Sequence, residues 1–163
     1  YSAARLQRVT KEISLFGTLR GQFADGNLDS SQKFILGGPT GVRAYPVGEA
    51  SGDQGHAFTF ETRYDVPLNF SFGAFQVVCF ADCGWIELNK DPWQGAVTNA
   101  EGKNRYWLSG AGAGINLTLS ELYSVRFAYA RRIDDNTGRS ESGMDSDNQK
   151  DKDRFWLQAS MWM

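Results

Sequence analysis

One histidine lies close to residues that could complete a hydrolytic triad. His56 follows Ser51 and Asp53, and a serine, a histidine and an aspartate can together activate a hydroxyl nucleophile. However, no Gly-x-Ser-x-Gly elbow surrounds the serine, and the neighbouring glycine-rich segment lacks the Gly-Lys-Ser/Thr of a phosphate-binding loop. We therefore interpret His56 as a polar residue at the start of a strand and expect no enzymatic activity.

Carboxylates gather in the segment 134–153, which carries seven acidic and three basic side chains and therefore a net charge of −4. Such a cluster could bind calcium, but its spacing lacks the EF-hand pattern and the glycine of that loop. Clusters of cysteine and histidine with metal-ligand spacing are also missing, so we expect neither a metal nor a cofactor. We expect the segment to be a solvated, mobile external loop.

A glycine-rich segment at 37–55 contains a single arginine, Arg43. Its six glycines and two prolines predict defined turns. One arginine amid so little charge suggests a single carboxylate partner, and Asp82 in the later stretch 80–84 is the candidate. A buried carboxylate is costly unless it is paired, and an arginine can form a planar, bidentate pair with it.

Strands must position these residues, because hydropathy alternates along the chain with a period of two. In 58–66, for example, aromatic residues alternate with Thr59, Glu61 and Arg63. We find no convincing helix and assign residues 3–12 to the beginning of the first strand. The pattern predicts an all-β, antiparallel chain with six strands, at 12–23, 58–66, 71–87, 105–118, 122–132 and 154–163.

The connections between these strands alternate strictly between tight and long. Tight links lie at 66–69 and 119–121, whereas the long ones cover about 25–55, 89–104 and 134–152. In an antiparallel meander, every long loop then lies at one end and every tight turn at the other, as in outer-membrane β-barrels. Several strands also reach the roughly 9–11 residues that a membrane-spanning strand needs.

A transmembrane barrel turns one face of each strand toward lipid and the other toward an aqueous lumen. Strand parity places Asp82, Glu61 and Arg63 on the lumenal face. Aromatic residues near the strand ends could form the interfacial girdles: Tyr64, Phe70, Trp85, Tyr106, Trp107, Tyr123 and Trp162. Six strands are fewer than the roughly eight of the smallest bacterial barrels, and Tyr1 is not a start residue, so we expect the C-terminal part of a larger barrel.

Composition agrees with this interpretation and excludes other classes. The 163 residues include 22 aromatic residues and 18 glycines, which favours β structure over disorder. With 17 basic and 19 acidic side chains the net charge is −2, so we expect no nucleic-acid partner. No run of 18 apolar residues exists, which excludes a transmembrane helix.

Two groups of residues carry a resemblance to a known family. They are Gly38, Val42, Arg43, Ala44, Tyr45, Gly52, Asp53 and Gly55 in the glycine-rich segment, and Phe80, Asp82 and Gly84 in a later strand. Together with the stretches 60–67 and 154–160, they resemble the two-partner secretion transporters, the haemolysin secretion/activation proteins of Gram-negative outer membranes. The resemblance covers essentially the whole chain and is most specific in 34–67.

This resemblance implies a 16-stranded barrel, preceded by two periplasmic polypeptide-transport-associated domains, of which this chain would be the last six strands. It implies that the loop 25–55 enters the barrel and sets Arg43 against Asp82. The implied function is export of a large, unfolded partner protein of the haemolysin or adhesin type across the outer membrane. Outer-membrane lipid and the barrel-assembly machinery are the other implied partners.

Two alternatives and one departure accompany this expectation. The first alternative is an outer-membrane insertase, a related protein class that shares the arginine loop. The second is a soluble β-sandwich that acts as a binding module and does not enter a membrane. Ala44 stands where the wider superfamily usually has glycine, and it would be strained if that position required a positive φ angle.

Overall fold

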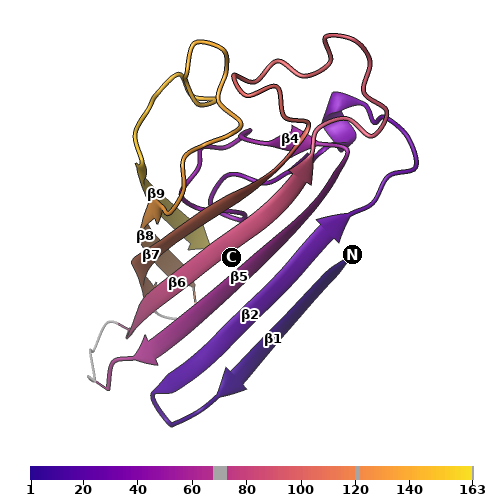
Figure 1. The fold of residues 1–163 in the computed structure, drawn as a ribbon. Helices are drawn as coiled ribbons and strands as arrows, with labels where there is room; N and C mark the ends of the chain where they lie inside the picture. The colour runs from indigo at the N-terminus through magenta and orange to yellow at the C-terminus, as the bar shows by residue number, and fades with distance from the viewer. Residues whose placement is uncertain (68–72, 120–121, 163) are drawn as a thin grey trace.

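The computed structural model describes residues 1–67, 73–119 and 122–162. Its main feature is one antiparallel sheet that curves into an open trough (Figure 1). The strands follow one another around the trough in the order β1 (Ser2–Arg8), β2 (Ile13–Gln22), β5 (Gln54–Asp65), β6 (Ala74–Glu87), β7 (Arg105–Leu119), β8 (Tyr123–Arg132) and β9 (Asp153–Met161).

The connection between β2 and β5 carries its own short elements. A 3₁₀ turn (Ser30–Gln32) precedes β3 (Phe34–Ile35), which pairs with β4 (Ser51–Gly52). Figure 1 shows this connection at the same end of the sheet as the two other long ones, β6 to β7 and β8 to β9. The tight β1–β2 connection, which the sequence did not predict, lies at the opposite end. The three long connections thus lie together as expected, whereas the predicted tight links at 66–69 and 119–121 fall largely outside the described residues.

The prediction of six strands is wrong by one. Residues 3–12 do not extend the first strand, because the chain reverses at 9–12 and β1 pairs with β2 as a hairpin. The Thr10 hydroxyl accepts hydrogen bonds from the backbone N–H groups of Glu12 and Ile13, at 3.2 and 2.9 Å, and so closes the turn. In addition, β2 ends at Gln22 and β5 begins at Gln54, so the long connection covers 23–53, two residues earlier than the predicted 25–55.

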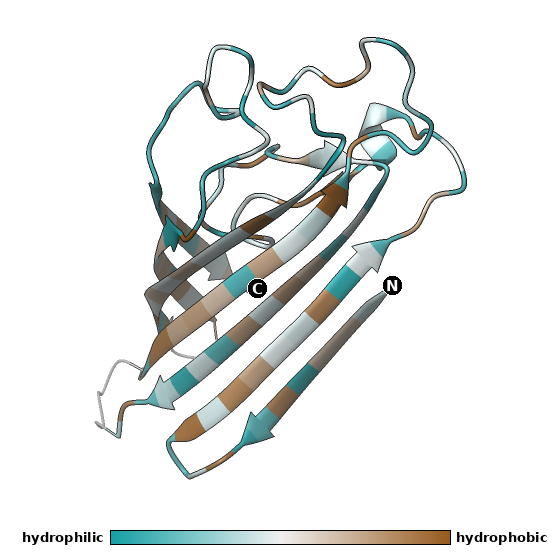
Figure 2. Cartoon of the chain, viewed as in Figure 1, coloured by the Kyte–Doolittle hydropathy of each residue, from teal (hydrophilic) through white to brown (hydrophobic). Residues whose placement is uncertain are grey.

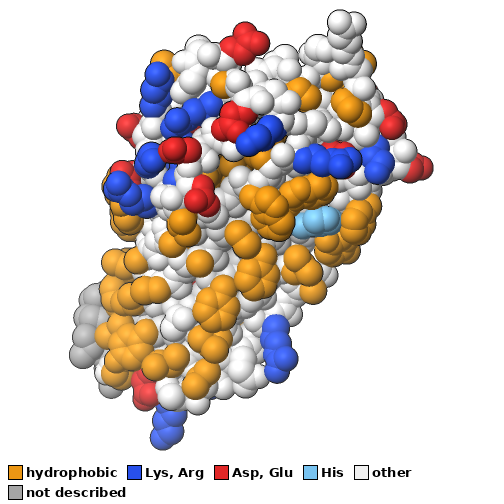
Figure 3. All heavy atoms as spheres, in the orientation of Figure 1, with side chains coloured by type: hydrophobic (Ala, Val, Ile, Leu, Met, Phe, Trp, Pro, Cys, Tyr) orange, Lys and Arg blue, Asp and Glu red, His pale blue; other side chains and the backbone are white. Residues whose placement is uncertain are grey.

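Hydrophilic and hydrophobic residues form bands along the strands in front, β2, β5 and β6 (Figure 2). On the convex face, large apolar side chains are exposed, among them Trp107, Phe155 and Leu157 at 65, 66 and 73%. Figure 3 shows these side chains gathered over the strands and the charged ones gathered mainly at the loop end. An apolar band bounded by charge is the surface that a lipid bilayer covers.

The core lies inside the trough, where the β2–β5 connection packs against the wall. Leu36, Val42 and Tyr45 from this connection are fully buried, as are Ile86 of β6 and, to within 1%, Leu108 of β7. A single curved sheet therefore buries its concave face against its own loop, which differs from the two packed sheets of a sandwich.

Several smaller expectations have different outcomes. Trp107 and Tyr123 are exposed, as expected of girdle residues. The girdle prediction is wrong for Tyr106, whose side chain points inward and is only 7% exposed. Within the described residues, no helix is long and apolar enough to cross a membrane. The remaining expectations lie outside the described residues, namely the turn positions 68–69 and 120–121 and the aromatic residue Phe70.

The two faces of β9 predict opposite tolerances to charge. Leu157→Arg would place a cation on the apolar convex face and should destabilise the membrane-embedded protein by about 2–4 kcal/mol. Its neighbour Gln158 points into the trough, so Gln158→Arg is the matched control and should change stability little. Chemical denaturation of the full-length protein in lipid vesicles measures both, and equal losses would contradict the assignment of the faces.

Candidate functional site

Arg43 lies inside the trough, where its guanidinium reaches Asp82 on β6. Its Nε and Nη2 atoms donate to the two carboxylate oxygens of Asp82, each at 2.8 Å, and its backbone N–H donates to Oδ2 at 3.2 Å. This is the bidentate pair that the sequence predicts. The two side chains are only 12 and 1% exposed, so each charge depends on the other for compensation.

Glu61 and Arg63 on β5 extend this pair into a chain of alternating charges. Nη1 of Arg43 donates to Glu61 at 2.8 Å, and Nε of Arg63 donates to the other oxygen of Glu61 at 2.8 Å. The Arg43 guanidinium also lies 3.4 Å from the ring centroid of Phe80. Burial alone would lower the pKa of Arg43, but Asp82 and Glu61 raise it above its ordinary value and keep the guanidinium charged.

The predicted motif residues around Arg43 are buried and shaped by turns. Val42, Ala44 and Tyr45 have no exposed surface. Gly38 has a φ of 108°, a conformation that favours glycine. Ala44 is not among the described residues with positive φ, so alanine is unstrained at this position.

The motif glycines of the strands lie where the loop approaches the wall. The Phe34 ring packs over Gly55, and the Leu36 side chain packs over Gly84. An added Cβ atom at Gly52, Gly55 or Gly84 would lie closer than 3.0 Å to a neighbouring atom. These three positions therefore allow the loop to lie directly on the strands.

Asp53 fastens the outer segments to one another. Its fully buried carboxylate accepts hydrogen bonds from the backbone N–H groups of Leu28 and Lys90, at 3.1 and 2.8 Å, and pairs with the Lys33 ammonium at 3.0 Å. Burial alone would raise the pKa of Asp53, but the Lys90 N–H, the Lys33 ammonium and the Leu28 N–H hold it below its ordinary value.

Asp145 is the centre of a second buried charge cluster, which the sequence did not reveal. Its fully buried carboxylate pairs with Arg132, with Arg139 at 3.3 Å and with Arg154 at 3.0 Å, and accepts a hydrogen bond from Asn136 at 2.9 Å. The expectation of a solvated external loop is therefore wrong at this position. Arginines, rather than calcium, compensate the carboxylate.

The same external loop is bound to the glycine-rich segment through Glu49. Glu49 is 3% exposed and accepts hydrogen bonds from the Asn136 side chain at 2.9 Å and from the Ser146 backbone N–H at 2.8 Å. We call the two packed segments, residues 46–53 and 133–152, the outer cap. None of these contacts follows from periodicity, because Glu49 and Ser146 are far apart in sequence.

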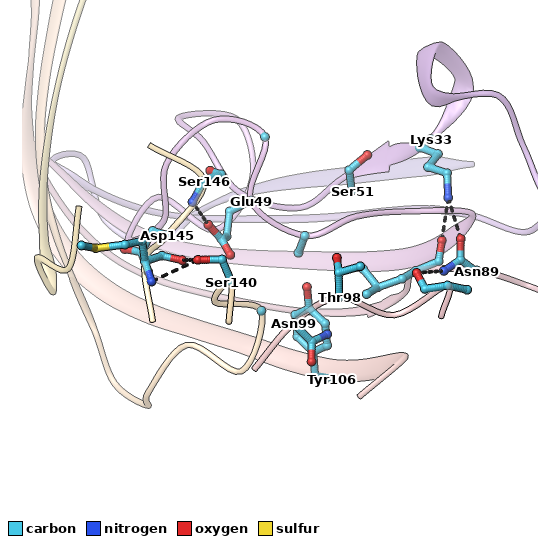
Figure 4. Close-up of a pocket in the computed structure, with 16 residues that line it drawn as sticks. Lys33, Glu49, Ser51, Asn89, Thr98, Asn99, Tyr106, Ser140, Asp145 and Ser146 are labelled. Carbon is cyan, nitrogen blue, oxygen red and sulfur yellow. Dashed lines mark hydrogen bonds between the residues drawn. The ribbon is translucent and has the colours of Figure 1, made fainter. Parts of the chain in front are cut away.

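Two hollows lie on either side of the docked loop. A pocket of about 360 Å³ lies between the outer loops, with Glu49 and Ser146 at one end and Lys33 and Asn89 at the other (Figure 4). A larger space of about 760 Å³ lies within the trough and is lined by both charged and neutral polar side chains, Arg43 among them. Apolar side chains, among them Phe16, Phe80 and Trp156, also line it, but the polar share is the larger one and suits an aqueous passage.

The residues that could have formed a hydrolytic triad are not assembled. His56 shares a hydrogen bond of 2.6 Å with Tyr1 and stacks on Trp85, while the Asp53 carboxylate is occupied by its own partners. Within the described ranges, no three histidine, cysteine or carboxylate side chains come together as metal ligands would. The arrangement can hold a loop in place, and it offers no activated nucleophile.

Comparisons with known proteins agree with this geometry. A model of the Omp85 superfamily domain matches residues 6–155. The heme/hemopexin transporter protein HuxB of Haemophilus influenzae is 32% identical over 157 residues, which cover 96% of this chain and 25% of HuxB. The structure of CdiB from Escherichia coli matches with a TM-score of 0.71 and 20% identity, over 99% of this chain and 27% of CdiB. The chain spans about a quarter of the length of these proteins.

The outer cap should open in acid. Because folding lowers the pKa values of Asp53 and Asp145, both carboxylates stabilise the cap above their ordinary pKa of about 3.9, and this stabilisation is lost as the pH falls through the lowered values. We expect pepsin to cleave residues 133–152 of the full-length protein faster below about pH 4, relative to other cleavage sites.

Asp145→Asn removes the titrating charge and is the matched variant. It should make cleavage of the cap fast already at about pH 5, because the arginines around position 145 lose their counter-charge. The role of the buried carboxylates would be contradicted if the ratio of cleavage in 133–152 to cleavage at the other sites stayed constant at every pH in both proteins.

Proposed function

Because this chain belongs to the Omp85 superfamily, we propose that it is the C-terminal part of an outer-membrane barrel that exports an unfolded partner protein by two-partner secretion. The observation that carries this proposal is the Arg43–Asp82 pair, which holds a long loop inside a sheet whose convex face is apolar. A docked loop of this kind can close a pore at rest and be displaced when a polypeptide passes.

The lining of the trough supports a passage for an extended chain. The space of about 760 Å³ beneath the loop has alternating charges at Arg43, Glu61 and Arg63 and neutral polar groups on the strands opposite. A wall of mixed sign, with polar and apolar side chains interspersed, holds no single class of side chain tightly. An unfolded polypeptide can therefore slide along it without a strongly bound intermediate.

The partner is a secreted protein of the haemolysin or adhesin type, and the site of action is the outer membrane of a Gram-negative bacterium. The name of HuxB assigns heme/hemopexin transport to that relative, and we extend to this chain only the transport of a partner. The apolar convex face fits outer-membrane lipid, and the barrel-assembly machinery would insert it. No enzymatic step, cofactor or nucleic acid enters this proposal.

A second candidate within the same superfamily is an outer-membrane insertase. The similarity to HuxB, a transporter, favours export. The number of periplasmic domains encoded upstream distinguishes the two functions, since two domains would favour secretion and a larger number would favour insertion. The soluble β-sandwich has no support, because the structure has one continuous seven-stranded sheet.

Reversing the charge of Arg43 should abolish export. Arg43→Glu places a carboxylate against Asp82 and Glu61 in a buried site, which should release the loop and reduce secretion of the partner to background. Adding Asp82→Arg restores opposite charges across the contact and should recover part of the secretion. Immunoblotting of the partner in culture medium measures both variants.

Arg126→Glu is the matched control. Arg126 also lines the trough, on β8, and the substitution changes the lumenal charge by the same amount without touching the loop. Secretion should fall far less than in Arg43→Glu, because the loop stays docked. Undiminished export by Arg43→Glu, with the protein present in the outer membrane, would refute a role for the pair in transport.

A further inference from the structure

The glycine-rich loop comes closest to β7 at Gly110. A Cβ atom added to Gly110 would lie closer than 3.0 Å to the Cβ atom of Ala44, which is fully buried. Gly110 is not among the described glycines with positive φ, so its backbone conformation is open to any residue. The need for glycine at position 110 therefore comes mainly from the close approach of the loop, with a second tight contact, of 3.2 Å, to the Arg131 carbonyl oxygen on β8.

Ala44 has no room to retreat from this contact. Its carbonyl oxygen accepts a hydrogen bond from Nε of Arg132 at 3.2 Å, and the preceding carbonyl, of Arg43, accepts one from Trp156 at 2.7 Å. A methyl group joined directly to the backbone cannot rotate away as the end of a long side chain can. Any enlargement at Gly110 must therefore move the backbone of the loop itself.

The residue displaced by such a movement is the one that makes the buried ion pair. Arg43 precedes Ala44 and is bound to Asp82 through both its guanidinium and its backbone N–H. The distance at which Ala44 rests on β7 consequently sets the position of Arg43 relative to β6. Movement of the loop backbone away from β7 would lengthen and misalign the two 2.8 Å hydrogen bonds of this pair and so weaken it.

We infer that Gly110 and Ala44 form a size-matched seat that positions Arg43 for its pair with Asp82. This inference rests on the proposed function only where it concerns export. Gly110 is a positioning residue, since it acts on Arg43 through Ala44.

The test is an exchange of volume across the contact in the full-length protein. Gly110→Ala overfills the seat and should both release the loop and reduce export. Adding Ala44→Gly removes the clashing methyl group, and the Cα atom at position 44 would lie 3.6 Å from the new Cβ atom, an ordinary contact. The 3.2 Å contact with the Arg131 carbonyl oxygen is common to both variants, so it does not affect the comparison between them. The double variant should therefore recover both loop docking and export.

Loop docking is measured without reference to export, by the reactivity of a thiol introduced with Val42→Cys. Val42 is fully buried, and the native Cys79 and Cys83 are first replaced by serine. Gly110→Ala should raise the rate of maleimide labelling at position 42 by roughly tenfold or more, as expected for an added methyl group in a packed site. The double variant should return the rate to that of the parent.

The matched control is Gly17→Ala on β2. An added Cβ atom there would have only one neighbour within 4 Å, the Thr59 carbonyl oxygen at 4.0 Å, so labelling and export should not change. Unchanged labelling in Gly110→Ala would overturn the seat, and so would a double variant that is labelled as fast as the single one. If labelling behaves as expected but the parent exports nothing, the seat stands and the export proposal fails.

Discussion

The buried pair of Arg43 and Asp82 is the interaction on which the rest of this structure depends. Neither charge has enough water around it to be stable alone, so the fold must bring a loop and a wall strand together. Asp82 points into the trough because of its parity on β6, and Arg43 can reach it only if the β2–β5 connection enters the trough. The path of the loop and the curvature of the sheet thus satisfy one electrostatic requirement.

The β2–β5 loop is held by two sets of contacts, which differ in how they would break when the loop is displaced. Near the lumen one compact contact fixes Arg43, made of its bidentate pair with Asp82 and its hydrogen bond to Glu61. At the outer end, Glu49 and Asp53 join the loop to the other external segments. The outer bonds are many and involve backbone groups, so they would open together as a unit. Displacement of the loop therefore requires loss of one strong contact and one cooperative network.

Sequence reasoning could predict the parts of this molecule that follow from short-range pattern. Alternation placed Asp82 and Glu61 on the inward face, and the isolated Arg43 pointed to its partner. The turn at Thr10 was missed, because hydrogen bonds from the backbone to a hydroxyl leave the alternation intact on either side. The environment of Asp145 was missed for a different reason, since its arginine partners lie on two different strands and come together only after folding.

Hydrogen exchange of the full-length protein in lipid tests the central claim most directly. The docked loop satisfies its own backbone, with N–H groups of Leu36, Gly38 and Val42 bonded within the loop at 3.2, 3.0 and 2.8 Å. We predict that amides 36–45 exchange as slowly as those of β6, and that Asp82→Asn raises their rate while β6 stays protected. Rapid exchange of this segment in the wild-type protein, equal to that of the external residues 91–96, would contradict the account.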